Sequence, residues 1–308
     1  MKILRAASEL APGSRKICLA IGFFDGVHLG HQQIIRQTIA DARQHDGIAL
    51  VVTFDQHPNT VVAPDRVPPL IYSPQQKLRA IESLGADALL LLRFNREFSE
   101  QTGEAFIRQR ASDLGRIQSI CVGADFVFGH KRTGNVELLK KLGAELNFTV
   151  HGVAAVSLDG QIVRSTRIRE AIRSGDFDAA SQMLGRAYSL ASRVMEGDKL
   201  GRTLGFPTAN LDITGLVLPP NGVYAAHAEV AGKNFHAVLN IGVRPTINQS
   251  TPAPRLEIHL LDFSSEQLYG KEIEVTFATK LRDERKFASL DELKTQIGRD
   301  IAEAKKHF

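Results

Sequence analysis

The sequence predicts an α/β protein in which a doubly wound parallel sheet is followed by an antiparallel β-barrel and a terminal helix. Three patterns indicate this. Short apolar runs alternate with helical segments up to residue 185, turn-separated strand runs follow from Arg186, and an amphipathic segment comes last. A chain of 308 residues is long enough for two domains of roughly 100–200 residues each. We therefore expect one domain over residues 1–185 and a second over residues 186–308.

The strand candidates of the first domain are uniformly apolar, as expected when helices cover both faces of a sheet. They are Ile17–Phe23, Ile48–Phe54, Ala88–Leu92, Ser119–Gly123 and Phe148–Val153. Helical patterns fill the intervals at Gln32–His45, Pro74–Leu84, Gly103–Leu114 and Val136–Leu142. Strand–helix–strand repetition implies parallel strands with right-handed crossovers, and ligands of such sheets bind at the carboxyl ends of the strands.

The character of the chain changes after two short helical patterns, Thr166–Ser174 and Phe177–Leu184. Later strand candidates are separated by turn sequences rich in glycine, proline and asparagine. They are Ser189–Met195, Gly222–Val230, Phe235–Ile241, Leu256–Leu261 and Ile273–Phe277. Short strands joined by turns are typical of a small antiparallel barrel, and Leu290–Ala304 then reads as an amphipathic helix.

The composition excludes several classes of function. Hydrophobic residues make up 43% of the chain and charged residues 23%, and no apolar run reaches the roughly 18 residues of a membrane-spanning helix. The net charge of +4 is spread along the chain, aromatic residues are only 6% and Trp is absent, so no nucleic-acid platform is expected. Cys18 and Cys121 lie in apolar runs and are expected to be buried, reduced thiols of a cytoplasmic protein.

The most informative stretch reads GFFDGVHLGH at residues 22–31, between a strand candidate and a helical pattern. It places His28 and His31 where a strand turns into a helix. A helix N-terminus has free N–H groups and partial positive charge, which suits phosphate, and glycines let the backbone approach it closely. Imidazole donors can stabilise charge on a phosphorus under attack. The alternatives are a metal pair, for which no third ligand is nearby in sequence, and two ordinary surface histidines.

This string resembles the H-x-G-H motif of the nucleotidyltransferase superfamily. In its longer form it is similar to the adenylyltransferase half of the bacterial bifunctional riboflavin kinase/FAD synthetase family. The resemblance implies a nucleotidyltransferase-like, Rossmann-type first domain and a riboflavin kinase barrel. Further strings of that family follow in order along nearly the whole chain.

Two of these strings lie in the first domain. Residues 123–134 read GADFVFGHKRTG, similar to the family's G-x-D-F-x-F-G-x-x-R-x-G, and residues 163–169 read VRSTRIR, similar to its S-T-x-x-R loop. Taken without the family, they are compatible with a turn over two core phenylalanines and with a capped basic helix. The resemblance implies flavin binding by Asp125, Phe126, Phe128 and Arg132. It also implies that His28 and His31 are catalytic. The residues that it implies for ATP binding are Gly22, Phe23, Asp25, Gly26, His28, His31, Ser165, Thr166, Arg167 and Arg169.

Two positions depart from the family pattern. Gln56, in the stretch TFDQHP at residues 53–58, stands where the family has proline, and Arg164 stands where serine is more usual. Gln56 is expected to soften its loop without touching the histidines. Arg164 either adds a phosphate contact or faces solvent, and the neighbouring His57 is equally compatible with a ligand and with a loop residue.

The second domain contains its own candidate phosphate-binding motif. Residues 197–210 read GDKLGRTLGFPTAN, similar to the riboflavin kinase string G-R-x-L-G-F-P-T-A-N. It is not a P-loop, because the G-K-[ST] ending is missing, but its glycines can bare backbone N–H groups to phosphate. Hydroxyl and amide oxygens are hard ligands suited to Mg²⁺, which makes Thr208 and Asn210 candidate metal ligands. The resemblance implies that ATP binds Lys199, Gly201, Arg202, Gly205, Thr208 and Asn210. The plain alternative is a Gly/Pro loop that joins two strands.

Two further stretches complete the second site. NIGVRPT at residues 240–246 and LEIHLLDF at residues 256–263 also match the family. Glu257 occupies its general-base position, where a carboxylate accepts the riboflavin 5′-hydroxyl proton as the γ-phosphorus is attacked. On strand alternation alone, Glu257 and His259 share one face and are also compatible with solvent. The resemblance implies that Arg285 contacts the flavin, and a charge-rich surface loop is the alternative there.

Together these strings predict a bifunctional transferase. ATP phosphorylates riboflavin to FMN in the barrel, and a phosphate oxygen of FMN attacks the α-phosphorus of ATP in the sheet domain to give FAD and pyrophosphate. Mg²⁺ is expected with ATP. The expected partners are these small molecules, without nucleic acid or membrane, and the oligomeric state is left open. The alternatives are an enzyme with one surviving activity or another phosphorylated acceptor, and a flavin-binding protein without Mg·ATP-dependent turnover.

Overall fold

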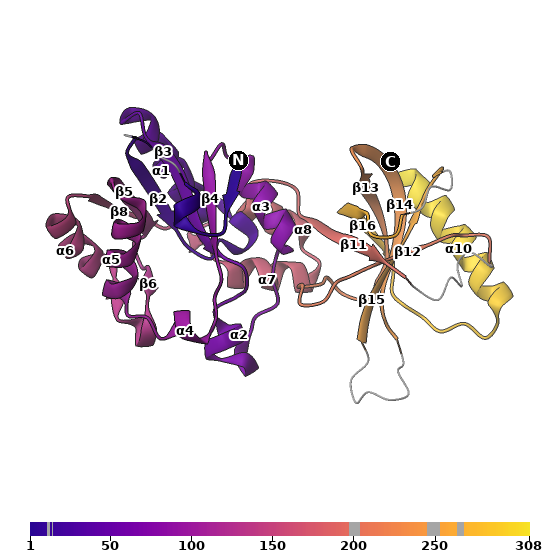
Figure 1. Ribbon diagram of the computed structural model, residues 1–308. Helices are drawn as coiled ribbons and strands as arrows, with labels where there is room; N and C mark the ends of the chain where they lie inside the picture. Colours follow the sequence, from indigo (N-terminus) through magenta and orange to yellow (C-terminus); the bar gives the residue numbers. More distant parts are fainter. Residues whose placement is uncertain (11–12, 14, 197–203, 245–252, 264–267) are drawn as a thin grey trace. The chain divides into compact units, whose positions relative to one another are not determined.

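The chain divides into two compact units, which are described separately (Figure 1). The computed structural model describes residues 1–10, 13, 15–196, 204–244, 253–263 and 268–308. The first unit, here called the sheet domain, comprises Met1–Leu70 and Pro74–Arg167. The second, the barrel domain, comprises Ile71–Ser73 and Ile168–Phe308. The division falls inside helix α7 (Ser165–Ser174), and α8 (Phe177–Leu184) belongs to the barrel domain.

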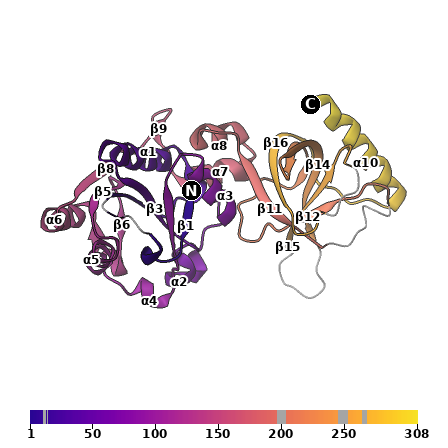
Figure 2. The same ribbon diagram turned by 45° about the horizontal axis from the view of Figure 1, so that its top comes forward.

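The sheet domain is a six-stranded, all-parallel sheet with helices on both faces, which confirms the predicted fold class (Figure 2). Its strands, in sheet order, are β1 (Lys2–Leu4), β4 (Ala88–Leu92), β3 (Ile48–Phe54), β2 (Ile17–Ile21), β5 (Ile117–Gly123) and β8 (Thr149–Val153). Its helices are α1 (Leu29–Gln44), α2 (Asn59–Val62), α3 (Pro74–Glu82), α4 (Arg96–Ser99), α5 (Gly103–Leu114) and α6 (Val136–Leu146). None of the helices in the described residues is long and apolar enough to cross a membrane.

Alternate strand residues fill two separate cores. Along β2, Leu19 and Ile21 belong to the core that includes residues of α5 and α6, whereas Cys18 and Ala20 belong to the core that includes residues of α1 and α3. All four are at most 2% exposed. Burial on both faces explains why these strands read as continuous apolar runs rather than as alternating ones.

The turns at the carboxyl ends of the strands contain several short elements. They are the 3-10 turns η2 (Asp25–Val27), η3 (Pro64–Arg66) and η4 (His130–Arg132), and the hairpins β6–β7 (Val127–Phe128, Gly134–Asn135) and β9–β10 (Ser157–Leu158, Gln161–Ile162). A further turn, η1 (Ala7–Glu9), follows β1. Strand β2 ends at Ile21, two residues before its predicted end, because the chain enters a left-handed conformation at Phe24. The edge strand β1 was not predicted from the sequence.

The barrel domain is a closed antiparallel barrel of six strands, also as predicted. In barrel order they are β11 (Ser189–Met195), β12 (Ala209–Leu211), β15 (Ala253–Leu260), β14 (Lys233–Arg244), β13 (Gly222–Val230) and β16 (Glu272–Arg282). Strand β12 was not predicted, because three residues after a glycine–proline loop carry no periodic signal. Its pairing with β15 sets Asn210 opposite Glu257.

Two helical segments cover the barrel. On α8, Phe177 stacks against Phe277 of β16, with ring centroids 4.8 Å apart. At the other end, α10 (Leu290–Ala304) packs on β13 and β14 and buries Ala304 completely. The Oγ of Ser289 accepts the N–H of Glu292 at 3.2 Å, so Ser289 is the N-cap of α10. A last turn, η5 (Lys305–His307), follows α10.

Candidate active sites

The H-x-G-H turn connects β2 to α1 through an unusual backbone. Phe24, Gly26 and Val27 have φ angles of 56°, 74° and 42°. A β-branched residue such as Val27 rarely adopts positive φ, so the turn is strained, and such strain persists only where the surrounding structure holds it. The turn makes His28 the N-cap of α1, and its Nδ1 accepts the N–H of His31 at 3.4 Å. A neutral His28 therefore carries its ring proton on Nε2.

The two histidines form one unit. Their rings stack with centroids 3.6 Å apart at 20°, and the ring of Phe24 meets His31 edge-on at 5.3 Å. Burial holds the pKa of His31 well below its usual value, and the charges of His28 and Lys77 lower this pKa further. His31 is therefore neutral at pH 7. Its buried Nδ1 has no hydrogen-bond partner among the described residues, and a phosphate oxygen would supply one to the N–H tautomer.

Lys77, from α3, holds this turn in place, and the sequence analysis did not identify it. Its side chain is buried, and its ammonium donates to the carbonyl oxygens of Phe23 and Phe54 at 3.3 and 3.0 Å and to Thr53 Oγ1 at 3.4 Å. It also lies 4.3 Å from the centre of the Phe23 ring. Burial lowers the pKa of Lys77 to about 8, against the opposing influence of the Asp25 carboxylate.

A cavity of about 520 Å³ opens beside the histidines at this edge of the sheet. Among the residues predicted to bind ATP, it is lined by Gly22, Phe23, His28, His31 and Ser165. The topology therefore brings the H-x-G-H string and the start of the S-T-x-x-R string to one cavity, 134 residues apart in sequence between His31 and Ser165. A backbone that starts a helix beside neutral imidazoles can bind phosphate oxygens.

The other residues predicted to bind ATP lie differently. Asp25 and Gly26 are buried within the turn, and Thr166 is exposed. Arg167 donates to the carbonyl oxygens of Gln161 and Ile162 at 3.0 and 3.1 Å, so it holds the β9–β10 hairpin. Arg169 is buried and belongs to the barrel domain.

Arg164 and Asp125 meet at the rim of the histidine cavity. Their side chains are 60% and 83% exposed, and Arg164 Nη2 lies 3.8 Å from Asp125 Oδ2. An ion pair this open to solvent contributes little to stability. Both residues line the histidine cavity, so Asp125, predicted to bind flavin, lies with the candidate phosphate-binding residues.

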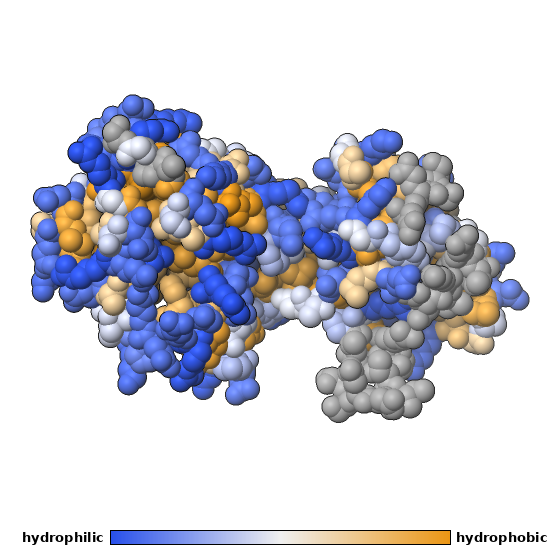
Figure 3. All heavy atoms as spheres, viewed as in Figure 1, coloured by the Kyte–Doolittle hydropathy of each residue, from blue (hydrophilic) through white to orange (hydrophobic). Residues whose placement is uncertain are grey.

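An aromatic cavity of about 580 Å³ adjoins the same turn. Phe126 and Phe128 stack within its wall, 5.1 Å apart at 17°, and Arg132 also lines it. Hydrophobic side chains reach the surface in this region, between α5 and α2 (Figure 3). Four residues line both cavities, so the two cavities adjoin: Ile21, Gly22, Phe23 and Phe126. Four more lining residues escaped the sequence analysis because they are spread over three elements and a loop: Phe54, Phe94, Phe98 and Phe106.

The hairpin under this aromatic wall depends on glycine. Gly129 has φ of 75°, and a Cβ there would lie 2.2 Å from the backbone nitrogen of Gly103 at the start of α5. A side chain would therefore force apart two backbone segments and strain the turn.

Gln56, which departs from the family pattern, connects the loops that follow β3 and β4. Gln56 Nε2 donates to the Phe94 carbonyl at 2.6 Å, and Asp55 Oδ1 accepts the Phe94 N–H at 2.9 Å. The side chain of Gln56 thus anchors its loop. His57 Nδ1 accepts the N–H of Asn59 at 3.0 Å, which places it in the loop structure.

A third cavity, of about 310 Å³, lies in the barrel domain. Of the predicted residues, Thr208, Glu257 and Arg285 line it, together with His259, whose Nδ1 donates to the Pro207 carbonyl at 2.8 Å. Gly205 has φ of 90°, a conformation that suits glycine. The predicted phosphate-binding residues Lys199, Gly201 and Arg202 lie outside the described residues.

Arg255 joins the predicted general base, Glu257, to the predicted metal ligand Asn210, and the sequence analysis missed it. Its Nε donates to Asn210 Oδ1 at 2.7 Å and lies 2.7 Å from Glu257 Oε1. Both side chains of the ion pair are about one quarter exposed, at 27% for Arg255 and 26% for Glu257. The carboxylate and amide oxygens therefore converge on one cationic nitrogen. Hard oxygens gathered around positive charge are the donor set that suits Mg²⁺.

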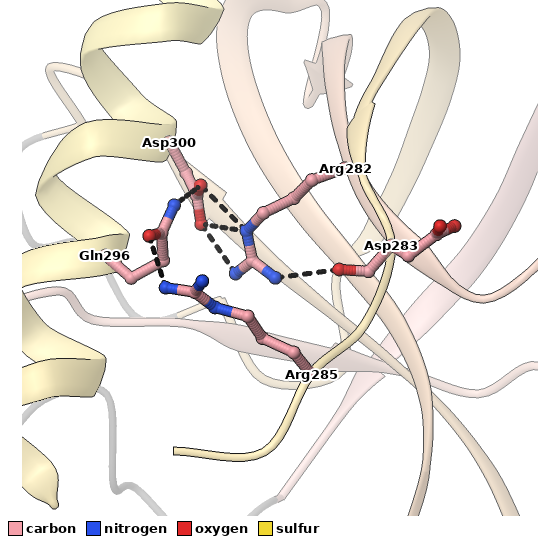
Figure 4. Close-up of polar contacts among 5 residues, drawn as sticks. All are labelled: Arg282, Asp283, Arg285, Gln296 and Asp300. Atoms are coloured by element: carbon pink, nitrogen blue, oxygen red, sulfur yellow. Dashed lines mark hydrogen bonds and ion pairs between the residues drawn. The ribbon is translucent and has the colours of Figure 1, made fainter. Parts of the chain in front are cut away.

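A network anchored on α10 positions Arg285 at the same cavity (Figure 4). Asp300, which is buried, forms a bidentate pair with Arg282, with Nε and Nη2 at 2.9 and 2.8 Å. Gln296 donates to Asp300 at 2.7 Å and accepts from Arg285 at 2.6 Å. Arg282 and Arg285 both lie near the ring of Phe287, at 5.7 and 4.9 Å. The loop before α10 is exposed, and the contact between Arg285 and Gln296 ties it to the helix.

The fold and the cavities together define a two-domain enzyme that uses nucleotides. Family models match both halves of the chain: FAD synthetase over residues 11–167 and riboflavin kinase over residues 184–308. Two full-length relatives are named bifunctional riboflavin kinase/FMN adenylyltransferase. The protein of Haemophilus influenzae is 37% identical, and the alignment covers 100% of this chain and 99% of that protein. The protein of Escherichia coli K12 is also 37% identical, and the alignment covers 100% of this chain and 98% of that protein. The chain therefore belongs to the family of bifunctional riboflavin kinase/FMN adenylyltransferases.

A solved structure shows the same fold. The protein from Streptococcus pneumoniae, described as a macrolide-efflux protein, aligns with a TM-score of 0.79 at 28% identity and covers 98% of both chains. The likeness extends over both domains.

Proposed function

We propose that the protein converts riboflavin to FMN in its barrel domain and FMN to FAD in its sheet domain, using ATP in each step. Our proposal assigns the two reactions to residues 186–308 and 1–185, respectively, and the ranges of the two family matches support it. The observation that carries the proposal is the presence of candidate reaction cavities in each domain, lined by residues of the predicted strings. ATP, riboflavin, FMN and FAD are then the small-molecule partners, and we assign the enzyme to the cytoplasm.

In the sheet domain, His28 and His31 would stabilise the α-phosphate of ATP as it is attacked. Both lie at the first turn of α1, where backbone N–H groups add to the positive potential. A neutral His31 donates a hydrogen bond without taking the proton of the attacking phosphate. The chemistry is in-line displacement, with no covalent intermediate, so the residues act by positioning and by charge stabilisation.

The aromatic cavity would hold the flavin ring for this step. A flat, apolar isoalloxazine suits the paired rings of Phe126 and Phe128, and Arg132 on the same wall can meet an anionic group. Because Phe23 borders both cavities, a flavin in one and a nucleotide in the other would meet near the H-x-G-H turn. The two reacting phosphates would then lie beside His28 and His31.

In the barrel domain, Glu257 would accept the 5′-hydroxyl proton of riboflavin as the γ-phosphate is transferred. Thr208 and Asn210 would hold Mg²⁺, which neutralises phosphate charge when bound with ATP. Arg285, fixed by Gln296, would contact the flavin. Lys199, Gly201, Gly205 and Arg202 would contribute the phosphate loop.

The test separates the two reactions in one protein. Wild-type protein, His31→Ala and Glu257→Ala are each incubated with riboflavin and Mg·ATP, and flavins are separated by chromatography over time. His31→Ala should accumulate FMN without FAD. Glu257→Ala should make no FMN but still convert supplied FMN to FAD. If either substitution stopped both reactions in a folded protein, the assignment of one reaction to each domain would be wrong.

A further inference from the structure

The kinase cavity contains a protein cation, Arg255, in contact with Asn210, one of the two predicted metal ligands. Residues 255 and 257 lie two apart on β15, so both side chains leave the same face of the strand. The β12–β15 register sets Asn210 opposite Glu257. Strand pairing therefore brings the three side chains together.

The contact distances show that the guanidinium occupies a cation position. Arg255 Nε is 2.7 Å from an amide oxygen of Asn210 and 2.7 Å from a carboxylate oxygen of Glu257. A divalent ion bound to Asn210 Oδ1 would stand within a few ångströms of this nitrogen. Two cations at such a separation repel, so a metal ion bound to Asn210 favours movement of the guanidinium away from this oxygen.

We propose that Arg255 is a built-in substitute for the divalent cation, which neutralises Glu257 and holds Asn210 until Mg·nucleotide displaces it. The inference rests on the proposed kinase function. It makes Arg255 a positioning residue that keeps the base and the metal ligand together in the nucleotide-free protein. It also raises the concentration of metal that the site requires, because the metal must displace a neighbouring charge.

Substitution of Arg255 by glutamine removes the charge and keeps a side chain of comparable reach. Arg193→Gln, on the exposed face of β11, is the matched control because it makes the same charge change outside the cavity. Mn²⁺ alone serves as the probe: it is titrated into the nucleotide-free, full-length proteins, and the free ion is followed by electron paramagnetic resonance. Loss of one positive charge about 4 Å from a divalent ion should tighten Mn²⁺ binding about tenfold in Arg255→Gln.

Arg193→Gln should bind Mn²⁺ as the wild type does, and adding Asn210→Ala to Arg255→Gln should abolish the tighter binding. The Mg²⁺ concentration for half-maximal riboflavin phosphorylation should fall in Arg255→Gln. The Mg²⁺ requirement of FMN adenylylation should not change.

Unchanged or weaker Mn²⁺ binding in Arg255→Gln would overturn the inference. A large fall in kcat at saturating Mg²⁺, with no shift in the Mg²⁺ requirement, would do the same, because Arg255 would then act on the reaction itself. A wild-type protein that made no FMN would instead refute the proposed function, while the Mn²⁺ titration would still decide whether Arg255 occupies a cation site.

Discussion

Replacing Lys77 with methionine should change how the stability of the sheet domain depends on pH. The side chain of Lys77 is only 4% exposed, and burial lowers the pKa of its ammonium from 10.5 to about 8. Methionine fills a similar volume without a charge. Lys141→Met is the matched control, because Lys141 lies exposed on α6 of the same domain.

The direction in which stability changes with pH follows from proton binding by Lys77 in the folded and unfolded states. Below about pH 8, Lys77 is protonated in both states, so folding carries the full cost of burying the ammonium. Between about pH 8 and 10.5, the unfolded chain binds a proton that the folded protein does not, so stability rises with pH. At about 1.4 kcal/mol per pH unit, the interval between the two pKa values corresponds to ~3 kcal/mol.

The assay is urea unfolding followed by far-UV circular dichroism, at a series of pH values from about 7.5 to about 10.5. The unfolding free energy of wild type, relative to that of Lys77→Met, should rise by ~3 kcal/mol over this range. The same difference for Lys141→Met should stay nearly flat. Lys77→Met should also slow FMN adenylylation, because Phe23 and Phe54 lose the donor that fixes their loops, and leave riboflavin phosphorylation unchanged. A flat difference for Lys77→Met would show that the ammonium is not charged and buried as described.

Two other substitutions test the supports of the sites. Gln296→Leu removes the amide that bridges Arg285 and Asp300. The KM for riboflavin should therefore rise about five- to thirtyfold with little change in kcat. A fall in kcat at unchanged KM would contradict this. Gly129→Ala forces a Cβ against the Gly103 backbone, so it should destabilise the sheet domain by more than about 1 kcal/mol and weaken FMN binding. Urea unfolding and flavin fluorescence titration check the second case, and an unchanged midpoint with unchanged affinity would refute the packing argument.

Much of the fold was predictable because it rests on local signals. Strands buried on both faces read as apolar runs, and α1, α5 and α10 begin at or near their predicted residues. The predicted order of strands and helices led to a parallel sheet followed by an antiparallel barrel, and both are confirmed. The elements that were not predicted are short. Among them, β1 and β12 have three residues each, too few to show a periodic pattern.

The candidate sites were only partly predictable, for a different physical reason. A sequence motif identifies residues that lie close together in the sequence. The family motifs alone identified His28, His31, Thr208 and Glu257 as candidates. The supporting contacts depend on long-range pairing, which a single sequence does not encode locally.

The sequence by itself determined the class of fold, the order of the two domains and the strings that mark two phosphate-transfer sites, because periodicity and spacing act within a few residues. Only the tertiary structure decided that Lys77 of α3 holds the H-x-G-H turn and that Arg255 stands between Asn210 and Glu257. Charge and hydrogen bonding act through space, and they join residues that strand register and helix packing bring within 3 to 4 Å.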